Sequence, residues 1–392
     1  MTNWNQSLAK DSHIELIRVI GGGPAGLIFA LLNAHEKHKI VIHEKLDLDQ
    51  LLNQSRALAL SASSIDILKK INIDPKKNLE FIPINKIHTS QKESFGRVII
   101  DQGESDPVGF VIRYDHLIKH LLDKINANLN ISIHFKSEVI DMNVKESFFR
   151  DVDDKKYNYN FLIFSDGIGN LLDNQFKFSV DNEIANYSAL VCEVDTQLKH
   201  ENIAYERFTP DGPIALLPIN NNSSSKLVWT GNNYFIEGLL KLNNNEFIEL
   251  FHENFGERLG QVKEIGEKIV YPLRQQYMLK PYTENILVLG NAAHTMHPVA
   301  GQGLNLTIRD IAYLTTLLQK NQYLIDQDTL KEYFDNRVKE MKSFMKLTHF
   351  LVKGFSNDYV GINKIRSLSL FLLDNQKIIK DNFINKFNYG SN

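Results

Sequence analysis

Gly21-Gly22-Gly23-Pro24-Ala25-Gly26 is the stretch that decides the fold of this chain. The apolar run at residues 15–20 precedes it and predicts a β-strand, and residues 25–37 follow with apolar residues at helical spacing. Residues 39–44 predict a second strand, which completes a βαβ unit of about 30 residues. A unit of this kind predicts a parallel sheet with helices packed on its faces.

The glycine spacing in this stretch has a physical reason in a nucleotide-binding turn. Gly21 allows a tight turn from strand to helix, Gly23 lets the backbone approach a pyrophosphate, and Gly26 lets the helix pack against the strand. Pro24-Ala25 would open the helix, whose free amides and positive dipole end attract the phosphates. Glu44, about 20 residues further on, ends the second strand, where an acid accepts a ribose hydrogen bond. This motif predicts a dinucleotide site but does not separate NAD from FAD.

A second glycine-rich segment lies far downstream, at residues 290–306, between a predicted strand and a helix expected to begin near Leu306. Gly301-Gln302-Gly303 would let the backbone lie against a flat ring, and Pro298 would fix the chain at the edge of that ring. Amide hydrogens near Leu304-Asn305 could stabilise the negative charge that develops on a reduced flavin, as an oxyanion hole does. The two segments together predict two walls of one flavin site, and packing alone is the structural alternative for this loop.

The downstream segment resembles the second FAD motif of the class A aromatic monooxygenases, and more narrowly that of the ubiquinone-biosynthesis hydroxylases. Most class A relatives carry Gly-Asp where this chain has Gly290-Asn291, and an amide can still bond the ribitol chain. Residues 205–218 resemble a run that these hydroxylases place in the sheet covering the substrate pocket. The resemblance therefore spans most of the chain, in the correct order.

The resemblance assigns three further positions to the cofactor site. Asp166-Gly167 follows a predicted strand and is similar to the family's Asp-Gly motif, which serves both FAD and NAD(P)H, although the residues after it depart from the family pattern. Arg56 lies in a segment similar to the one that carries an FAD-contacting arginine. Arg113 is a further candidate, since Tyr114 holds the place where many relatives have the arginine. An ordinary turn and a surface salt bridge are the alternatives for Asp166 and Arg56.

The expected fold class is α/β, with a Rossmann-like FAD domain that is discontinuous in sequence, a mainly antiparallel sheet as substrate domain, and C-terminal helices. We expect the FAD domain at residues 1–80, 107–180 and 276–330, and the sheet domain at residues 81–106 and 181–275. The C-terminal helices are expected at residues 331–392.

The resemblance implies an FAD-dependent monooxygenase that hydroxylates the aromatic ring of a polyprenylated phenol in ubiquinone biosynthesis. NAD(P)H or another reductant would reduce FAD, and oxygen would add as a flavin C4a-hydroperoxide. No side chain is an obvious catalytic base, so catalysis is assigned to the flavin and its loop. Two alternatives stay open, a prenyl reductase or dehydrogenase on the same frame and a non-catalytic flavin-binding subunit of a quinone-biosynthesis complex.

Composition narrows the partners of this 392-residue chain. The formal net charge of −3 gives no case for nucleic-acid binding, and the single cysteine, Cys192, excludes an intrachain disulfide. His294 and His297 lie in a loop without a nearby carboxylate in sequence, so no metal site is expected. The polar N-terminus does not resemble a signal peptide, which favours a cytoplasmic protein.

The C-terminal region, residues 331–392, carries eleven basic and six acidic residues, with aromatic and leucine side chains between them. A basic amphipathic region of this kind can lie on an anionic membrane surface or on a partner protein. We therefore expect peripheral contact with the inner membrane face, where polyprenyl phenols reside. A helical face packed on the FAD domain is the alternative.

Overall fold

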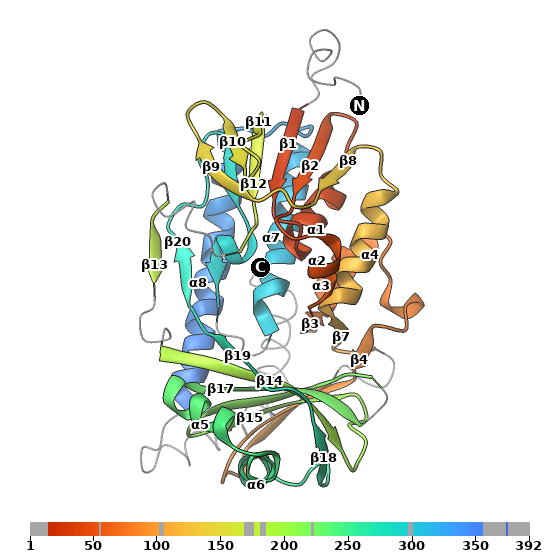
Figure 1. The fold of residues 1–392 in the computed structure, drawn as a ribbon, viewed down its shortest axis with the longest axis vertical. Helices are drawn as coiled ribbons and strands as arrows, with labels where there is room; N and C mark the ends of the chain where they lie inside the picture. Colours follow the sequence, from red (N-terminus) through yellow and green to blue (C-terminus); the bar gives the residue numbers. More distant parts are fainter. Residues whose placement is uncertain are drawn as a thin grey trace.

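The computed structural model describes residues 15–54, 56–101, 106–167, 176–180, 186–220, 223–296, 301–355 and Asp374. Figure 1 shows two layers of sheet, a parallel sheet in the upper half and a broad sheet across the lower end. The helix α8 (Gln327–Phe355) runs along one side of the molecule between them.

The upper sheet has five parallel strands in the order β21-β12-β1-β2-β8. Leu162, Ile163 and Phe164 of β12 are all buried, as expected for a strand covered on both faces. Helices cover one face, and the antiparallel strands β9, β10 and β11 cover the other. The bounds of these strands are β1 (Glu15–Ile20), β2 (His38–His43), β8 (Ile131–His134), β9 (Val139–Asn143), β10 (Phe148–Asp151), β11 (Lys156–Asn158), β12 (Phe161–Phe164) and β21 (Ile286–Val288).

The helices over this sheet come from distant parts of the chain. Buried residues of α1, α3, α4 and α7 form one core with the inward residues of the strands. Ser61 caps α3 by accepting a hydrogen bond from the backbone N–H of Ser64. The bounds are α1 (Pro24–Asn33), α2 (Leu48–Leu52), α3 (Ala62–Lys70), α4 (Tyr114–Asn126) and α7 (Gln302–Lys320).

The lower sheet has eight strands, in the order β18-β14-β17-β16-β15-β5-β6 with β19 paired to β14. Its pairs are antiparallel except for β15 with β5. Trp229 is fully buried beneath α5 (Asn233–Lys241) and α6 (Asn244–Phe255), which cover the outer face. The strand bounds are β5 (Lys86–Gln91), β6 (Arg97–Asp101), β14 (Tyr187–Thr196), β15 (Ile203–Thr209), β16 (Gly212–Pro218), β17 (Ser224–Asn232), β18 (Val262–Ile265) and β19 (Ile269–Pro272).

Two small sheets lie between the layers. One has the order β3-β7-β4, and the other has the order β13-β20-β22. Their bounds are β3 (Ala57–Ser61), β4 (Ile82–Ile84), β7 (Gly109–Arg113), β13 (Phe178–Val180), β20 (Gln276–Met278) and β22 (His294–Thr295). The strand β4 thus pairs with β7 and not with the eight-stranded sheet, and the exact domain boundaries stay a prediction.

The predicted α/β fold class is confirmed, including the parallel and antiparallel layers. Three details differ from the expectations. The helix α1 ends at Asn33 and not near residue 37, and α7 begins at Gln302, before Leu306. The helix α5 was not expected, because Gly238 and an exposed Tyr234 obscure its apolar stripe.

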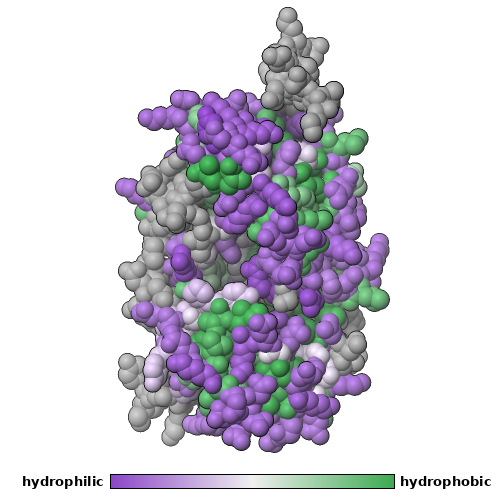
Figure 2. All heavy atoms as spheres, in the orientation of Figure 1, coloured by the Kyte–Doolittle hydropathy of each residue, from purple (hydrophilic) through white to green (hydrophobic). Residues whose placement is uncertain are grey.

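Within the described part of the chain, no helix is long and apolar enough to span a bilayer. On the face shown in Figure 2, polar side chains cover most of the surface, and apolar side chains gather in a few separate patches.

Candidate flavin site

The glycine turn between β1 and α1 is as tight as its sequence predicts. Gly21 has a φ of +103°, and a Cβ at this position would meet the backbone N of Asp166 at 2.8 Å. A Cβ on Gly26 would lie 2.1 Å from the carbonyl oxygen of Gly21, so the helix could not pack here with any other residue. Gly23 differs, because its nearest neighbour would be the Tyr114 hydroxyl at 3.6 Å. The chain itself therefore leaves space over Gly23, where the motif predicts the pyrophosphate.

Glu44 lies directly beside this turn. Its carboxylate accepts hydrogen bonds from the backbone N–H of Gly22 at 2.6 Å and of Leu46 at 2.9 Å. Burial raises the pKa of Glu44 and outweighs these two bonds, and the nearby charge of Asp166 adds to the rise. Asp166 itself is paired with Lys45 at 3.2 Å, and burial raises its pKa as well. The two acids thus flank the glycine turn, and their contacts with the cofactor stay a prediction.

Tyr114 is a site residue that the sequence analysis did not identify. It is buried at the start of α4, and its hydroxyl faces Gly23. The guanidinium of Arg56 lies over its ring, 4.6 Å from the ring centroid, and also bonds Gln54 at 2.7 Å. Tyr114 therefore places Arg56 at the mouth of the glycine turn, where a phosphate or ring could meet it. The sequence signal for this residue was that Tyr114 stands where many relatives have an arginine.

Arg113, the other arginine candidate, is bound within the protein. Its guanidinium pairs with Asp115 at 3.1 Å, and it lies 4.0 Å from Glu193 of β14. The carboxylate of Asp115 and its hydrogen bonds raise the pKa of Arg113. Arg113 thus links the start of α4 to the eight-stranded sheet, and its contact with the flavin stays a prediction.

Gly290, at the start of the downstream motif, packs against the first turn of α1. This residue has a φ of +64°, and a Cβ on it would lie 3.2 Å from the Cβ of Ala25 and 3.5 Å from Thr307. Gly290 thus joins the first turn of α1 to α7, so the two sequence motifs meet in space. Asn291, which follows, is exposed and lies in a short 3-10 helix. An exposed amide at this place is available to a ligand.

Asn305 has a structural role that the sequence analysis did not anticipate. Its side-chain amide donates to the carbonyl oxygens of Ala59 at 2.9 Å and Gly301 at 2.8 Å. Its Oδ1 accepts from the Ser61 backbone N–H at 2.9 Å and from the Ser64 hydroxyl at 2.7 Å. All its usual hydrogen bonds are made within the protein. The side chain therefore fixes the flavin loop to β3 and α3, and only its backbone is left for the predicted cofactor contact.

The start of α7 is open toward the site. Gly301 adopts the left-handed conformation (φ +60°) as the N-cap residue, and no side chain of the described residues caps the helix. Gly303, in the first turn, has no heavy atom of the described chain within 4 Å of a Cβ placed on it. The backbone amides of Gly303 and Leu304 belong to the first turn of the helix, at its positive end. This arrangement suits a developing negative charge.

Pro298 and its neighbours at residues 297–300 lie outside the described residues, as does His297. The predicted place of Pro298 at the ring edge therefore stays a prediction. Among the residues that are described, no cluster of His, Cys, Asp or Glu could hold a metal ion.

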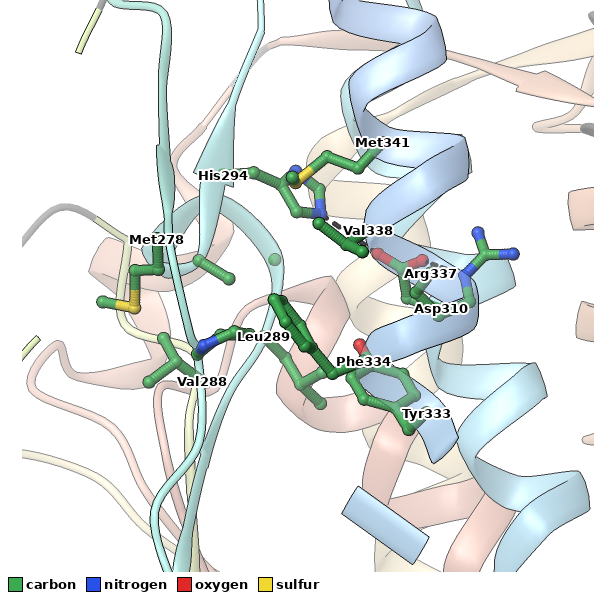
Figure 3. Close-up of a pocket in the computed structure, with 13 residues that line it drawn as sticks. Met278, Val288, Leu289, His294, Asp310, Tyr333, Phe334, Arg337, Val338 and Met341 are labelled. Atoms are coloured by element: carbon green, nitrogen blue, oxygen red, sulfur yellow. Dashed lines mark hydrogen bonds and ion pairs between the residues drawn. The ribbon is translucent and has the colours of Figure 1, made fainter. Parts of the chain in front are cut away.

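A buried network of charges joins β22, α7 and α8, and Figure 3 shows three of its members, His294, Asp310 and Arg337. Asp310 of α7 bonds the His294 Nε2 atom at 3.0 Å and also bonds the Arg337 guanidinium of α8. Arg337 in turn bonds Glu340, which pairs with Arg309 at 3.0 Å. Burial opposes the charge of Asp310, but Arg337 and His294 outweigh it and hold the pKa of Asp310 below its usual value.

The cavity beside this network measures about 30 Å³, far less than the roughly 150 Å³ of a cavity that binds benzene, so an aromatic substrate cannot enter it. The network therefore acts as a brace between α8, α7 and β22. The adjacent charges Arg309-Asp310 inside an otherwise apolar helix were the sequence signal for it.

These features fit an FAD site of the Rossmann-like flavoproteins. A buried acid, Glu44, directly follows β2, and the described chain leaves open space over Gly23 and Gly303. The start of α7 meets the first motif through Gly290. The fold and the site thus define a flavin-dependent enzyme of the two-layer class.

Comparison with known proteins gives the same class. The chain belongs to the FAD binding domain family, which it matches over residues 14–347. It is 35% identical to the ubiquinone hydroxylase UbiL of Rhodospirillum rubrum over 201 residues, 50% of this chain and 47% of that protein. The match to UbiL therefore covers about half of each chain.

A second relative matches along nearly its whole length. The chain is 25% identical to the 3-demethoxyubiquinol 3-hydroxylase of Escherichia coli, over 93% of this chain and 96% of that protein. The fold of this chain is similar to that of p-nitrophenol 4-monooxygenase PnpA from Pseudomonas putida, with a TM-score of 0.75. The two chains are 15% identical, and the match covers 96% of this chain and 98% of PnpA. The protein is an FAD-dependent oxidoreductase.

Proposed function

We propose that this protein hydroxylates the aromatic ring of a polyprenylated phenol in ubiquinone biosynthesis. The full-length similarity to a 3-demethoxyubiquinol 3-hydroxylase carries this proposal. The similarity to UbiL over half of the chain supports it independently. NAD(P)H is the proposed reductant, and oxygen is the second substrate.

In this proposal FAD supplies the oxygen chemistry when bound, and the protein positions it and excludes water. Gly23 and the first turn of α1 would hold the pyrophosphate, and Glu44 would accept a hydrogen bond from the ribose. The amides at the start of α7 would stabilise negative charge on the flavin ring. Asn305 keeps these amides in place, because its bonds to Gly301 and Ala59 fix the helix start.

The test is an oxygen-incorporation assay. Purified, FAD-loaded protein is given a short-chain 2-prenylphenol, NADH or NADPH, and ¹⁸O₂, and the product is weighed by mass spectrometry. We expect one labelled oxygen atom in the ring. A gain of two hydrogens and no oxygen would refute hydroxylation, and so would FAD-loaded protein that fails to turn over prenylphenols with nicotinamide or chemical reductants.

We also propose that the basic C-terminal region contacts the membrane that carries the substrate. Deleting all of residues 331–392 would be a poor test, because Arg337 and Glu340 of α8 belong to the buried network. A truncation after Phe355 leaves that network intact. We expect the full chain to sediment with vesicles rich in phosphatidylglycerol and the truncated chain to remain in the supernatant. Equal sedimentation of both chains would refute this role for residues 356–392.

A further inference from the structure

The strand β15 places Glu206 on the inner face of the eight-stranded sheet. Side chains alternate along a strand, and the outward positions are identified by their contacts. Tyr205 packs edge-on against Phe255 of α6, and Arg207 donates to the carbonyl oxygen of Asn254 at 2.8 Å. The even-numbered residues of β15 must therefore face the other way. Glu206 projects from the side of the sheet that is turned toward the FAD domain.

The neighbours of Glu206 along the strand confirm this direction. Ala204 and Phe208 are buried in one cluster, against which Ala57 and Ala59 of β3 also pack. A Cβ on Gly301 would lie 3.3 Å from the Cβ of Ala59, so β3 contacts the flavin loop as well. The surface that carries Glu206 is thus one strand away from the predicted ring site.

On β16 and β17, beside Glu206, the inner face of the sheet is more accessible than the outer face. Ala215 lies opposite Glu206 on β16, Thr89 lies beside it on β5, and Val228 follows on β17. All three are only half-buried, whereas the outward residues of the same strands, such as Trp229, are covered by α5 and α6. Small, accessible side chains around one carboxyl group form a surface on which an aromatic ring can lie.

Glu206 also forms no ion pair with any residue in the described part of the chain. Lys226 of β17, which pairs in register with Leu217 of β16, is engaged with Glu193 at 3.2 Å. Burial raises the pKa of Glu206 to about 8. A carboxyl group held near the working pH without a protein partner is suited to exchanging a proton with a ligand.

We propose that Glu206 binds the hydroxyl group of the phenolic substrate and accepts its proton. In this step the phenol O–H bond breaks, an O–H bond to the carboxylate forms, and the electron pair stays on the phenol oxygen. The ring thereby becomes a better nucleophile toward the oxygen atom that the flavin delivers. This inference rests on the proposed function and adds a substrate-binding base to it.

The experiment compares Glu206→Gln with wild type on two prenylphenols, one unsubstituted and one fluorinated on the ring to lower the pKa of its hydroxyl. We expect kcat/KM of the variant to fall by about 100-fold on the unsubstituted phenol, within the usual range for loss of a general base. The fluorinated phenol should restore much of this loss, because it ionises without help. The wild-type kcat/KM should rise with pH through about 8 and level off above it, where the carboxylate form dominates, and this limb should vanish in the variant.

The control is Glu253→Gln, since Glu253 lies on α6 at the outer side of the same sheet and is well exposed. It should leave both phenols and the pH profile unchanged. Wild-type rates and an unchanged pH profile in Glu206→Gln would overturn the inference while leaving the proposed function intact.

A second readout separates the two proposals if no oxygen is incorporated. The fluorinated phenol is titrated into oxidised, FAD-loaded protein, and its phenolate absorbance is followed. Ionisation on binding to wild type but not to Glu206→Gln would support the base while the proposed hydroxylation fails. Equal ionisation in both proteins, or no binding of the phenol, would overturn the base.

Discussion

Replacing Gly303 by alanine should affect the stability of the apoprotein and its affinity for FAD in opposite directions. Gly303 lies in the first turn of α7, and a Cβ there would have no heavy atom of the described chain within 4 Å. Glycine in a helix costs roughly 0.5–1 kcal/mol relative to alanine. The apoprotein should therefore be equal to wild type or more stable by up to about 1 kcal/mol. FAD should bind at least ten times more weakly, about 1.4 kcal/mol, because the methyl group occupies the space left for the ring.

Gly238 of α5 offers a matched control. It is also helical with no described atom within 4 Å of a Cβ, but it lies exposed on the outer side of the eight-stranded sheet. Gly238→Ala should show the same stability gain and unchanged FAD affinity. Stability is measured by urea unfolding of the apoproteins, and affinity by quenching of FAD fluorescence. Wild-type FAD affinity in Gly303→Ala would refute the reasoning that the open space at this glycine serves the flavin.

Three further outcomes follow from the geometry. Gly26→Ala should yield little folded protein, because its Cβ would lie 2.1 Å from the Gly21 carbonyl oxygen; soluble expression with native circular dichroism would contradict this. Asp310→Asn should destabilise the protein by about 3 kcal/mol, since it leaves Arg337 and His294 without the charge they face, and a shift under 1 kcal/mol in urea unfolding would refute this. The folded pKa of Asp310 is depressed, so its contribution is present above the unfolded pKa of about 4 and is lost as pH falls through the lower folded value; unfolding midpoints of wild type should drop more steeply than those of Asp310→Asn below that pH.

The local structure around the first motif was predictable because its reasons are local. The strand prediction at residues 15–20 matches β1, and the glycine turn that follows it leads into α1 as its spacing predicts. The residues at which helices begin were predicted less accurately. Gly301 and Gly303, on either side of Gln302, suggested a loop, but they lie at the N-cap and in the first turn of α7. A glycine is tolerated at the start of a helix, and Gly303 leaves open space above this turn.

The contacts between distant segments were not predictable from the sequence. Asn305 looked like a cofactor residue, but its partners lie on β3 and α3, far earlier in the chain. In the sequence, Tyr114 was noticed only because it stands where many relatives have an arginine. Its position beside Gly23 depends on how α4 packs against α1. Glu206 gave no sequence signal at all, because the face of a strand is decided by what the neighbouring strands and helices cover.

The order of strands in the parallel sheet has a consequence for synthesis of the protein. The edge strand β21 pairs with β12, yet it follows the glycine turn by more than 250 residues, and α7 comes later still. At about 5–20 residues per second, a ribosome needs on the order of 10–60 s between these two points. The nascent chain therefore presents half of its cofactor site for many seconds before the other half exists. Flavin supply at the moment of chain completion, rather than during elongation, should decide the yield of holoprotein.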